Sequence, residues 1–128
     1  MSDGVTVLVV DDKRALADAY STIIGVETEY ETVTAYSGEA GLARLDDDID
    51  VLLVDRNMPD MSGEDLVTTA RADGFDPRVV LVSGSRSAED TPSIEYDAYL
   101  LKTGNDYDEI LETLARVVNG GAGESAER

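Results

Sequence analysis

Apolar positions along the chain fall into two patterns. Short runs rich in β-branched residues and bounded by turn residues are typical of buried strands, whereas apolar residues spaced three and four apart are typical of one helix face. The two patterns alternate over about 115 residues. The strands are predicted over residues 5–10, 30–36, 51–55, 78–83 and 98–102.

The helical patterns lie between these strands and after the last one. Their predicted inward residues are Leu16, Ala19, Tyr20, Ile23 and Ile24; Leu42 and Leu45; Leu66, Val67 and Ala70; and Ile110, Leu111, Leu114, Ala115, Val117 and Val118. Ser62 and Asn105 are predicted to cap the last two of these helices. The polar segment from Gly84 to Asp97 contains Pro92, so we expect at most a short helix there.

Alternating strands and helices predict an α/β fold, a doubly wound five-stranded parallel sheet with right-handed crossovers. A length of 128 residues fits one domain. We expect residues 1–118 to form it and residues 119–128, which are rich in glycine, to be a flexible tail or a truncated linker. No apolar run approaches a membrane span, and the first residues do not resemble a signal peptide, so we expect a cytoplasmic protein.

Composition excludes several classes of function. The chain has no cysteine and no histidine, which excludes thiol chemistry, a phosphohistidine carrier, a Ser-His-Asp triad and most zinc sites. A net charge of −18 would repel the phosphate backbone of nucleic acids, so we do not expect direct binding of DNA or RNA. Because molar salt would screen this self-repulsion, and because lysine is scarce, we expect a salt-loving source organism.

Four predicted strands end in polar residues that can do chemistry. These are Asp11 with Asp12, Asp55, Ser83, and Lys102, which is one of two lysines in the chain. With 28 acidic residues, any one aspartate is most simply a solvated surface group, and Ser83 or Lys102 alone is most simply a turn or surface residue. Together, however, the carboxyl ends of parallel strands share one edge of the sheet, where ligands bind.

Three carboxylates at one edge would repel one another, at a cost of about 4 kcal/mol for each pair 4 Å apart at an effective dielectric near 20. A proton or a cation must offset this repulsion. Oxygen ligands and few carboxylates favour Mg²⁺ over Ca²⁺. With a cation and Lys102 beside it, Asp55 could attack a phosphoryl group and form an acyl phosphate, while Ser83 donates a hydrogen bond to the phosphoryl oxygens.

Residues 5–118 resemble the receiver domain of two-component response regulators, a CheY-like superfamily. The resemblance rests on four pieces in this order: Val10-Asp11-Asp12, Asp55-x-x-Met58-Pro59-x-x-x-Gly63, Ser83-Gly84 and Tyr99-Leu100-Leu101-Lys102. Each piece is weak alone, but their order and spacing are highly specific. The run from Asp55 to Pro59 and the short segment before Tyr99 look most like haloarchaeal receivers of the HalX kind.

The resemblance implies a flavodoxin-like (βα)5 fold and a phosphorelay role. Asp55 would be the phosphoacceptor and a Mg²⁺ ligand. Asp12 would bind Mg²⁺ directly, Asp11 directly or through water, and the backbone carbonyl of Asn57 would be a further ligand. Lys102 would pair with the phosphoryl group. Ser83 and Tyr99 would form a switch pair, the hydroxyl moving to the phosphate and the ring turning inward. The simpler alternative for Tyr99 is a half-buried strand aromatic, and both descriptions can hold in different states.

The resemblance also implies partners. A sensor histidine kinase would donate the phosphoryl group, and the face from Gly84 to Val118 would bind a downstream protein or output domain, with a homodimer on phosphorylation as a further expectation. The chain would not be an enzyme beyond self-phosphorylation and slow autodephosphorylation. One departure concerns the residue after Lys102: receivers usually carry a proline there in a cis bond, whereas this chain has Thr103, so we expect a trans bond.

Two other classes of function stay open. One is an aspartate-nucleophile phosphohydrolase. Enzymes of that class carry an Asp-x-Asp motif after their first strand, and here Asn57 occupies the position of the second acid. The other is an interaction module whose acidic cluster binds a cation without chemistry.

Overall fold

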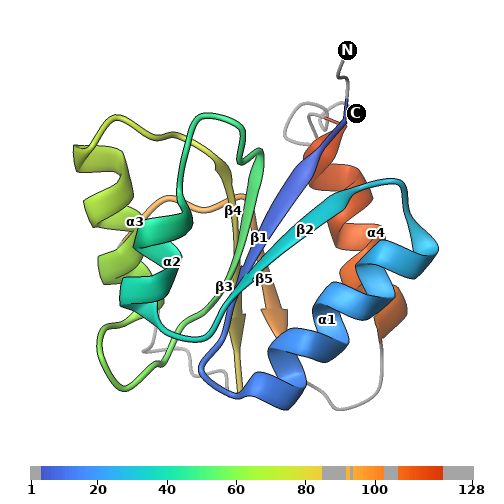
Figure 1. Cartoon of the computed structure of the whole chain (residues 1–128), viewed down its shortest axis with the longest axis horizontal. Helices are drawn as coiled ribbons and strands as arrows, with labels where there is room; N and C mark the ends of the chain where they lie inside the picture. The colour runs from blue at the N-terminus through green and yellow to red at the C-terminus, as the bar shows by residue number, and fades with distance from the viewer. Residues whose placement is uncertain (1–3, 85–91, 93, 103–106, 120–128) are drawn as a thin grey trace.

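A computed structural model of the chain describes residues 4–84, 92, 94–102 and 107–119. Within them lie five strands and four helices (Figure 1). Their order is β1 (Thr6–Val10), α1 (Arg14–Glu27), β2 (Glu31–Ala35), α2 (Gly38–Arg44), β3 (Val51–Asp55), α3 (Gly63–Ala72), β4 (Arg78–Ser83), β5 (Ala98–Leu101) and α4 (Tyr107–Val118).

The five strands form one parallel sheet in the order β2-β1-β3-β4-β5. This is the flavodoxin-like order of a doubly wound fold, so the predicted fold class is confirmed. Every residue of the central strand β3 is buried, as expected for a strand covered on both faces. Because all strands are parallel, their carboxyl ends meet at the lower edge in Figure 1.

Helices cover both faces of the sheet. In Figure 1, α2 and α3 pack on one face, and α1 and α4 pack on the other. Alternate strand residues face the two sides, as strand geometry requires. Those in the core with α1 and α4 include Val7, Val9, Val51 and Leu53, and those in the core with α2 and α3 include Leu8, Val10, Leu52 and Val54.

The predicted helix faces agree with these cores. Leu66, Val67 and Ala70 of α3 are buried, as are Leu114 and Val117 of α4. In α1 the fully buried alanine is Ala17, which the predicted set omitted, whereas Ala19 is half-buried. The strands match their predicted ranges to within one residue at each end.

Some expectations fall on residues outside the described part of the chain. These are the short helix within residues 84–97, the Asn105 cap, the Lys102–Thr103 bond and most of the tail. Among the described residues, no helix has the length and apolar character needed to cross a bilayer.

The loop after β3 is tightly wound. The N–H of Gly63 donates to the carbonyl of Arg56 at 2.9 Å, and Asn57 and Ser62 form an isolated antiparallel bridge. Ser62 Oγ accepts the Asp65 N–H at 2.9 Å and caps α3 as predicted. The loop therefore places the first residue of α3, Gly63, next to the last residue of β3, Asp55.

Asp60 ties the same loop to the neighbouring helix. Its two carboxylate oxygens accept the N–H groups of Gly38 at 3.0 Å and Glu39 at 2.8 Å. A carboxylate at a helix N-terminus is favoured by the helix dipole, and these two hydrogen bonds lower the pKa of Asp60. The start of α2 is thus attached to the loop that follows Asp55.

We predict that Gly63→Ala destabilises the protein by about 1–3 kcal/mol, because a Cβ at this position would lie 2.6 Å from the carbonyl oxygen of Asp55 and force the backbone apart. Chemical denaturation at constant salt would measure the loss. Gly25→Ala is the matched control: it is an exposed position in α1 where a Cβ meets no atom within 4 Å, so the same substitution should stabilise by up to about 1 kcal/mol. Equal effects of both substitutions would contradict the close-contact explanation.

Candidate functional site

Three carboxylates meet at the carboxyl edge of the sheet. Asp11 and Asp12 follow β1, and Asp55 ends β3; one carboxylate oxygen from each lies within 4.8 Å of the others. Asp11 and Asp55 are almost completely buried, at 1% and 3% exposure, and Asp12 is half-buried. The predicted cluster is present. Its acids are buried or half-buried, whereas acids that fell at strand ends by chance in so acidic a chain would be exposed to solvent.

Lys102 supplies the positive charge of the cluster. Its Nζ lies 3.1 Å from Asp11 Oδ2 and 3.1 Å from Asp55 Oδ2. Burial acts to lower the pKa of Lys102, but the hydrogen bond and charge of Asp55, followed by the charge of Asp11, outweigh burial and raise it. Lys102 is therefore an ammonium group at every physiological pH.

The environment of Asp55 opposes its ionisation. Burial is the largest influence and raises its pKa, and the charge of Asp11 adds to this. The N–H of Asn57, which donates to Asp55 Oδ1 at 3.1 Å, acts in the opposite direction, as does Lys102. The net effect is a raised pKa, so the ionised carboxylate of Asp55 is held at a cost.

The cluster suits a small divalent cation. Three carboxylates and one ammonium leave two negative charges when all are ionised, which one divalent ion would balance. Asp12 Oδ1 is buried and accepts no hydrogen bond from the described residues, and Asp11 Oδ2 has the Lys102 ammonium beside it but likewise accepts no hydrogen bond. A buried carboxylate oxygen without a donor is costly unless a cation meets it, and oxygen donors favour hard ions such as Mg²⁺.

Ser83 and Tyr99 occupy the neighbouring strands. Ser83 ends β4 at 1% exposure, and its carbonyl accepts the N–H of Lys102 at 2.8 Å, which holds the ends of β4 and β5 together. Tyr99 lies in β5 and is half-buried. Its hydroxyl accepts a hydrogen bond from Arg56 Nη1 at 3.1 Å. The structure thus brings Ser83 to the same edge and places Tyr99 nearby in β5, bound to Arg56.

Sequence reasoning missed Arg56 and its partner Glu64. Arg56 follows Asp55 directly and is 6% exposed, and Glu64 lies in the first turn of α3. The sequence did hold a signal for this pair. Side-chain alternation along the strand that ends at Asp55 directs residue 56 to the other face of the sheet, and a buried arginine there needs an acidic partner. No spacing rule, however, identifies which of the many acids it meets.

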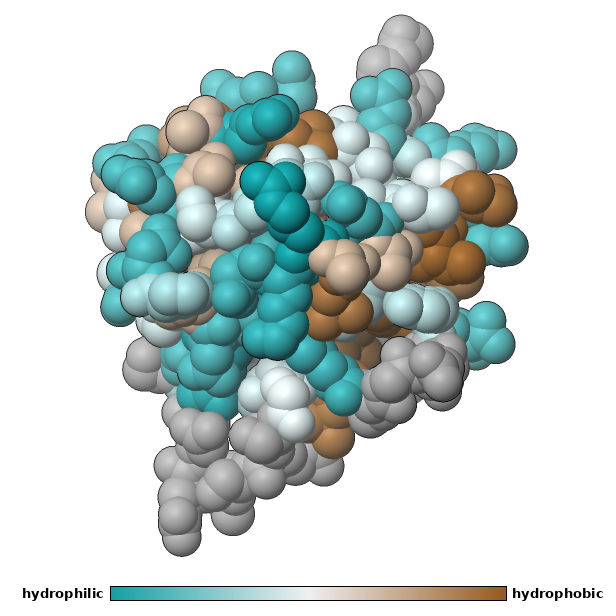
Figure 2. Space-filling view, turned by 60° about the horizontal axis from the view of Figure 1, so that its bottom comes forward, coloured by the Kyte–Doolittle hydropathy of each residue, from teal (hydrophilic) through white to brown (hydrophobic). Residues whose placement is uncertain are grey.

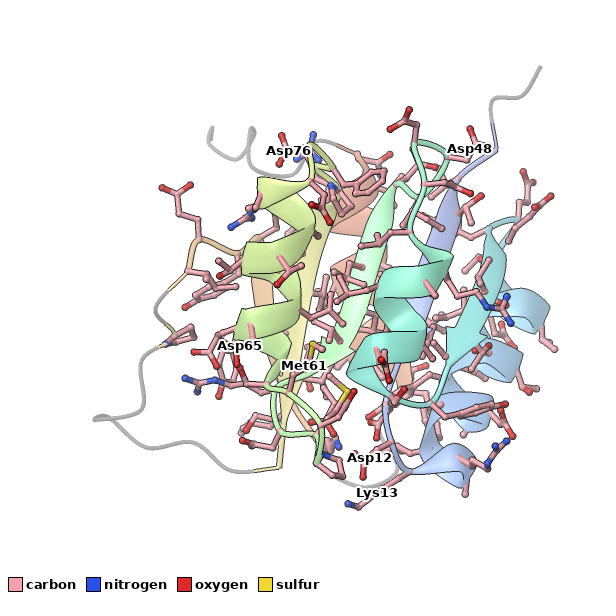
Figure 3. The ribbon with its side chains drawn as sticks, turned by 60° about the vertical axis from the view of Figure 1, so that its left-hand side comes forward. Asp12, Lys13, Asp48, Met61, Asp65 and Asp76 are labelled. Atoms are coloured by element: carbon pink, nitrogen blue, oxygen red, sulfur yellow. The ribbon has the colours of Figure 1, made fainter. Side chains whose placement is uncertain are left out.

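The face at which these strands end is strongly polar. Hydrophilic residues run across the middle of this face in Figure 2, with hydrophobic residues to their right. Figure 3 shows Asp12 and Lys13 at the lower end of the sheet, whereas Asp48 and Asp76 lie at the opposite end. The acidic cluster is therefore separate from the acidic turns at the other end of the strands.

Comparisons with known proteins give one consistent result. Residues 7–115 match the family described as "Response regulator receiver domain". A Haloferax volcanii protein described as a transcriptional regulator is 38% identical over 122 residues, which are 95% of this chain and 21% of that protein. This similarity to a protein of a haloarchaeon agrees with the salt-loving origin expected from composition.

Solved structures give the same result. A CheY-like receiver domain protein from Methanospirillum hungatei is 27% identical, with a TM-score of 0.81 over 96% of this chain and 100% of that one. The response regulator TrrA from Thermotoga maritima, solved in complex with Mg(2+)-BeF, is 25% identical, with a TM-score of 0.76 over 88% of this chain and 98% of that one.

We predict that Asp55→Asn stabilises the protein at pH 7 when divalent cations are chelated. A carboxyl group with a raised pKa makes the folded state lose stability as pH rises from its ordinary pKa of 3.8 through the raised value. The advantage of the variant should therefore be full above that window and disappear near pH 4. Thermal unfolding in molar KCl with chelator would measure it as a rise of about a few degrees in Tm.

The matched control is Asp47→Asn, which removes the same charge from an exposed position. Its Tm in molar KCl should equal that of the wild type at every pH. A variant at Asp55 that is no more stable than the wild type at pH 7 would contradict the burial argument.

Proposed function

The chain belongs to the family of response regulator receiver domains, and from this premise we propose that Asp55 is the residue that accepts the phosphoryl group. Receiver domains are phosphoacceptor switches of two-component systems. The observation that carries the proposal is the position of Asp55: it ends the central strand, is 3% exposed, and lies 3.1 Å from the ammonium group of Lys102.

The proposed reaction is a nucleophilic displacement at phosphorus. A carboxylate oxygen of Asp55 forms the new O–P bond, and the P–N bond of a phosphohistidine donor breaks, its electron pair leaving with the imidazole. The product is an acyl phosphate. Lys102, already 3.1 Å from Asp55 Oδ2, would offset the negative charge of the transferred oxygens. The Ser83 hydroxyl would donate a hydrogen bond to one of the transferred phosphoryl oxygens.

We propose that Asp11, Asp12, Asp55 and the backbone carbonyl of Asn57 hold Mg²⁺ in this reaction. Support comes from the buried oxygen of Asp12 that accepts no hydrogen bond from the described residues, and from the charge of the cluster. When bound, the ion would offset the charge on the attacking carboxylate and on the phosphoryl oxygens. The N–H of Asn57 already orients Asp55 through its hydrogen bond to Oδ1.

The proposed response involves Ser83 and Tyr99. Ser83 would follow the phosphoryl group, Tyr99 would turn inward, and the face from Gly84 to Val118 would change its affinity for a downstream protein or output domain. A sensor histidine kinase is the proposed donor. Homodimer formation on phosphorylation, slow autodephosphorylation and the absence of direct nucleic-acid binding by this domain belong to the same proposal.

The chain spans 21% of the Haloferax volcanii relative and 60% of a nitrate/nitrite response regulator homologue from Haemophilus influenzae. What the remaining parts of those proteins do is therefore no guide to this chain. We propose that residues 1–118 are the receiver domain and residues 119–128 a tail or linker, which is supported by the end of α4 at Val118.

A phosphohydrolase is the second candidate, but the site does not favour it. That chemistry uses an acid two residues after the nucleophile, and this position is Asn57, which is exposed. A cation-binding module without phosphoryl chemistry would explain the carboxylates but not the ammonium of Lys102 held between two of them.

We predict that acetyl phosphate with Mg²⁺ adds one phosphoryl group to the wild type and none to Asp55→Asn, measured as intact mass in molar KCl. Asp47→Asn is the matched control, because it removes the same charge from an exposed position outside the cluster and should still be labelled. Rapid multiple turnover of acetyl phosphate would support the hydrolase instead. No labelling of the wild type at any salt concentration would leave the cation-binding module.

We predict that Asp12→Asn weakens Mg²⁺ binding by more than about tenfold, since it removes a charged ligand with a buried oxygen that no described donor satisfies. Isothermal titration of the unphosphorylated protein would measure this without any reaction. Asp18→Asn, an exposed carboxylate on α1 that accepts the Tyr36 hydroxyl, should bind Mg²⁺ as the wild type does. Wild-type affinity in Asp12→Asn would place the ion elsewhere.

A further inference from the structure

Arg56 is held rigidly on the face of the sheet opposite to the carboxylate cluster. Its Nε donates to Glu64 Oε1 at 3.1 Å, and its Nη2 donates to Glu64 Oε2 at 2.9 Å. Two parallel hydrogen bonds between a guanidinium and a carboxylate fix the plane of the arginine as well as its position. Both side chains are well shielded, at 7% and 17% exposure, so solvent screens the pair only weakly.

The same guanidinium also contacts Tyr99. Arg56 Nη1 donates to the Tyr99 hydroxyl at 3.1 Å, and Arg56 Cζ lies 5.8 Å from the centre of the ring. The hydrogen bonding of Arg56 to the Glu64 carboxylate raises the pKa of Arg56 despite its burial, so the donor is always charged. A charged donor that α3 already orients thus holds the aromatic ring of β5 by its hydroxyl.

The backbone places this contact one peptide bond from Asp55. Along β3, Leu53 packs with α1 and α4, whereas Leu52 and Val54 pack with α2 and α3. Alternation puts Asp55 on the first side and Arg56 on the second. The Arg56 N–H continues the strand pairing by donating to the Val82 carbonyl at 2.8 Å. Asp55 and Arg56 therefore share one peptide unit while their side chains lie on opposite faces of the sheet.

We infer that Arg56, oriented by Glu64, is a positioning residue for Tyr99: it holds the ring in the unphosphorylated arrangement by its hydroxyl, and this hydrogen bond must break when the ring moves. The inference rests on the proposed function, in which Asp55 accepts the phosphoryl group and Tyr99 responds. A contact made in only one of two states biases the equilibrium toward that state. By linkage, removing the contact must tighten binding of whatever favours the other state.

The test uses beryllium fluoride with Mg²⁺ as the phosphoryl analogue. Tyr99→Phe removes the hydroxyl and keeps the ring, and Glu64→Gln removes the charge that orients Arg56. Each should bind the analogue about three to ten times more tightly than the wild type, the change expected from loss of one ordinary hydrogen bond. The double variant Glu64→Gln/Tyr99→Phe should gain no more than either alone, since both changes remove the same contact.

Two further measurements separate positioning from simple stabilisation. In the free protein, the ring signals of Tyr99 in a nuclear magnetic resonance spectrum should move in Glu64→Gln toward their position in the analogue-bound wild type. Arg56→Lys keeps the positive charge but loses the paired geometry, so it should also bind more tightly. Tyr36→Phe is the matched control, because its hydroxyl bonds to Asp18 away from this network, and it should bind the analogue as the wild type does.

The outcomes are distinguishable. Tighter binding by Tyr99→Phe and Glu64→Gln, without additivity, supports the inference. Unchanged or weaker binding by both overturns it while leaving the proposed function intact. A wild type that binds no analogue and takes no label from acetyl phosphate overturns the proposed function and this inference with it.

Discussion

The crowding of like charges at a buried sheet edge is the constraint on which the rest of this structure depends. Three carboxylates within 4.8 Å of one another, two of them almost fully buried, cannot all be ionised without compensation. Lys102, directly after β5, supplies part of it, while burial and the charge of Asp11 still raise the pKa of Asp55. The proposed Mg²⁺ would offset the negative charge that Lys102 leaves uncompensated at this edge.

The two faces of the sheet carry different groups of polar side chains. Asp55 lies with Lys102 on the side of α1 and α4, and Arg56 lies with Tyr99 on the side of α2 and α3. Alternation along one strand therefore places the proposed phosphoacceptor and the arginine that contacts Tyr99 at adjacent positions, with their side chains on opposite faces. The shielded Arg56–Glu64 pair is also costly to bury, which is easier to understand if it fixes a position than if it only adds stability.

Much of this could be predicted from the sequence, because the strongest signals were local. The run ending at Asp55 predicted the central strand, and one of only two lysines, in a chain with eight arginines, marked the end of β5. The contacts of Arg56 with Glu64 and of Asp60 with α2 could not be predicted in this way. They join segments whose separation depends on the path of a loop, and a chain with 28 acids offers too many partners for charge alone to select one.

The winding of the loop after β3 has an evolutionary consequence. Residue 56 is bonded to residue 63, residue 57 is bridged to residue 62, and Asp60 is bonded to the start of α2. Adding or deleting one residue would break at least one of these three ties and misdirect Asp55 or α2. A change in the length of this loop would therefore require these ties to be rebuilt, whereas exchange of the exposed Asn57 side chain leaves the backbone ties in place.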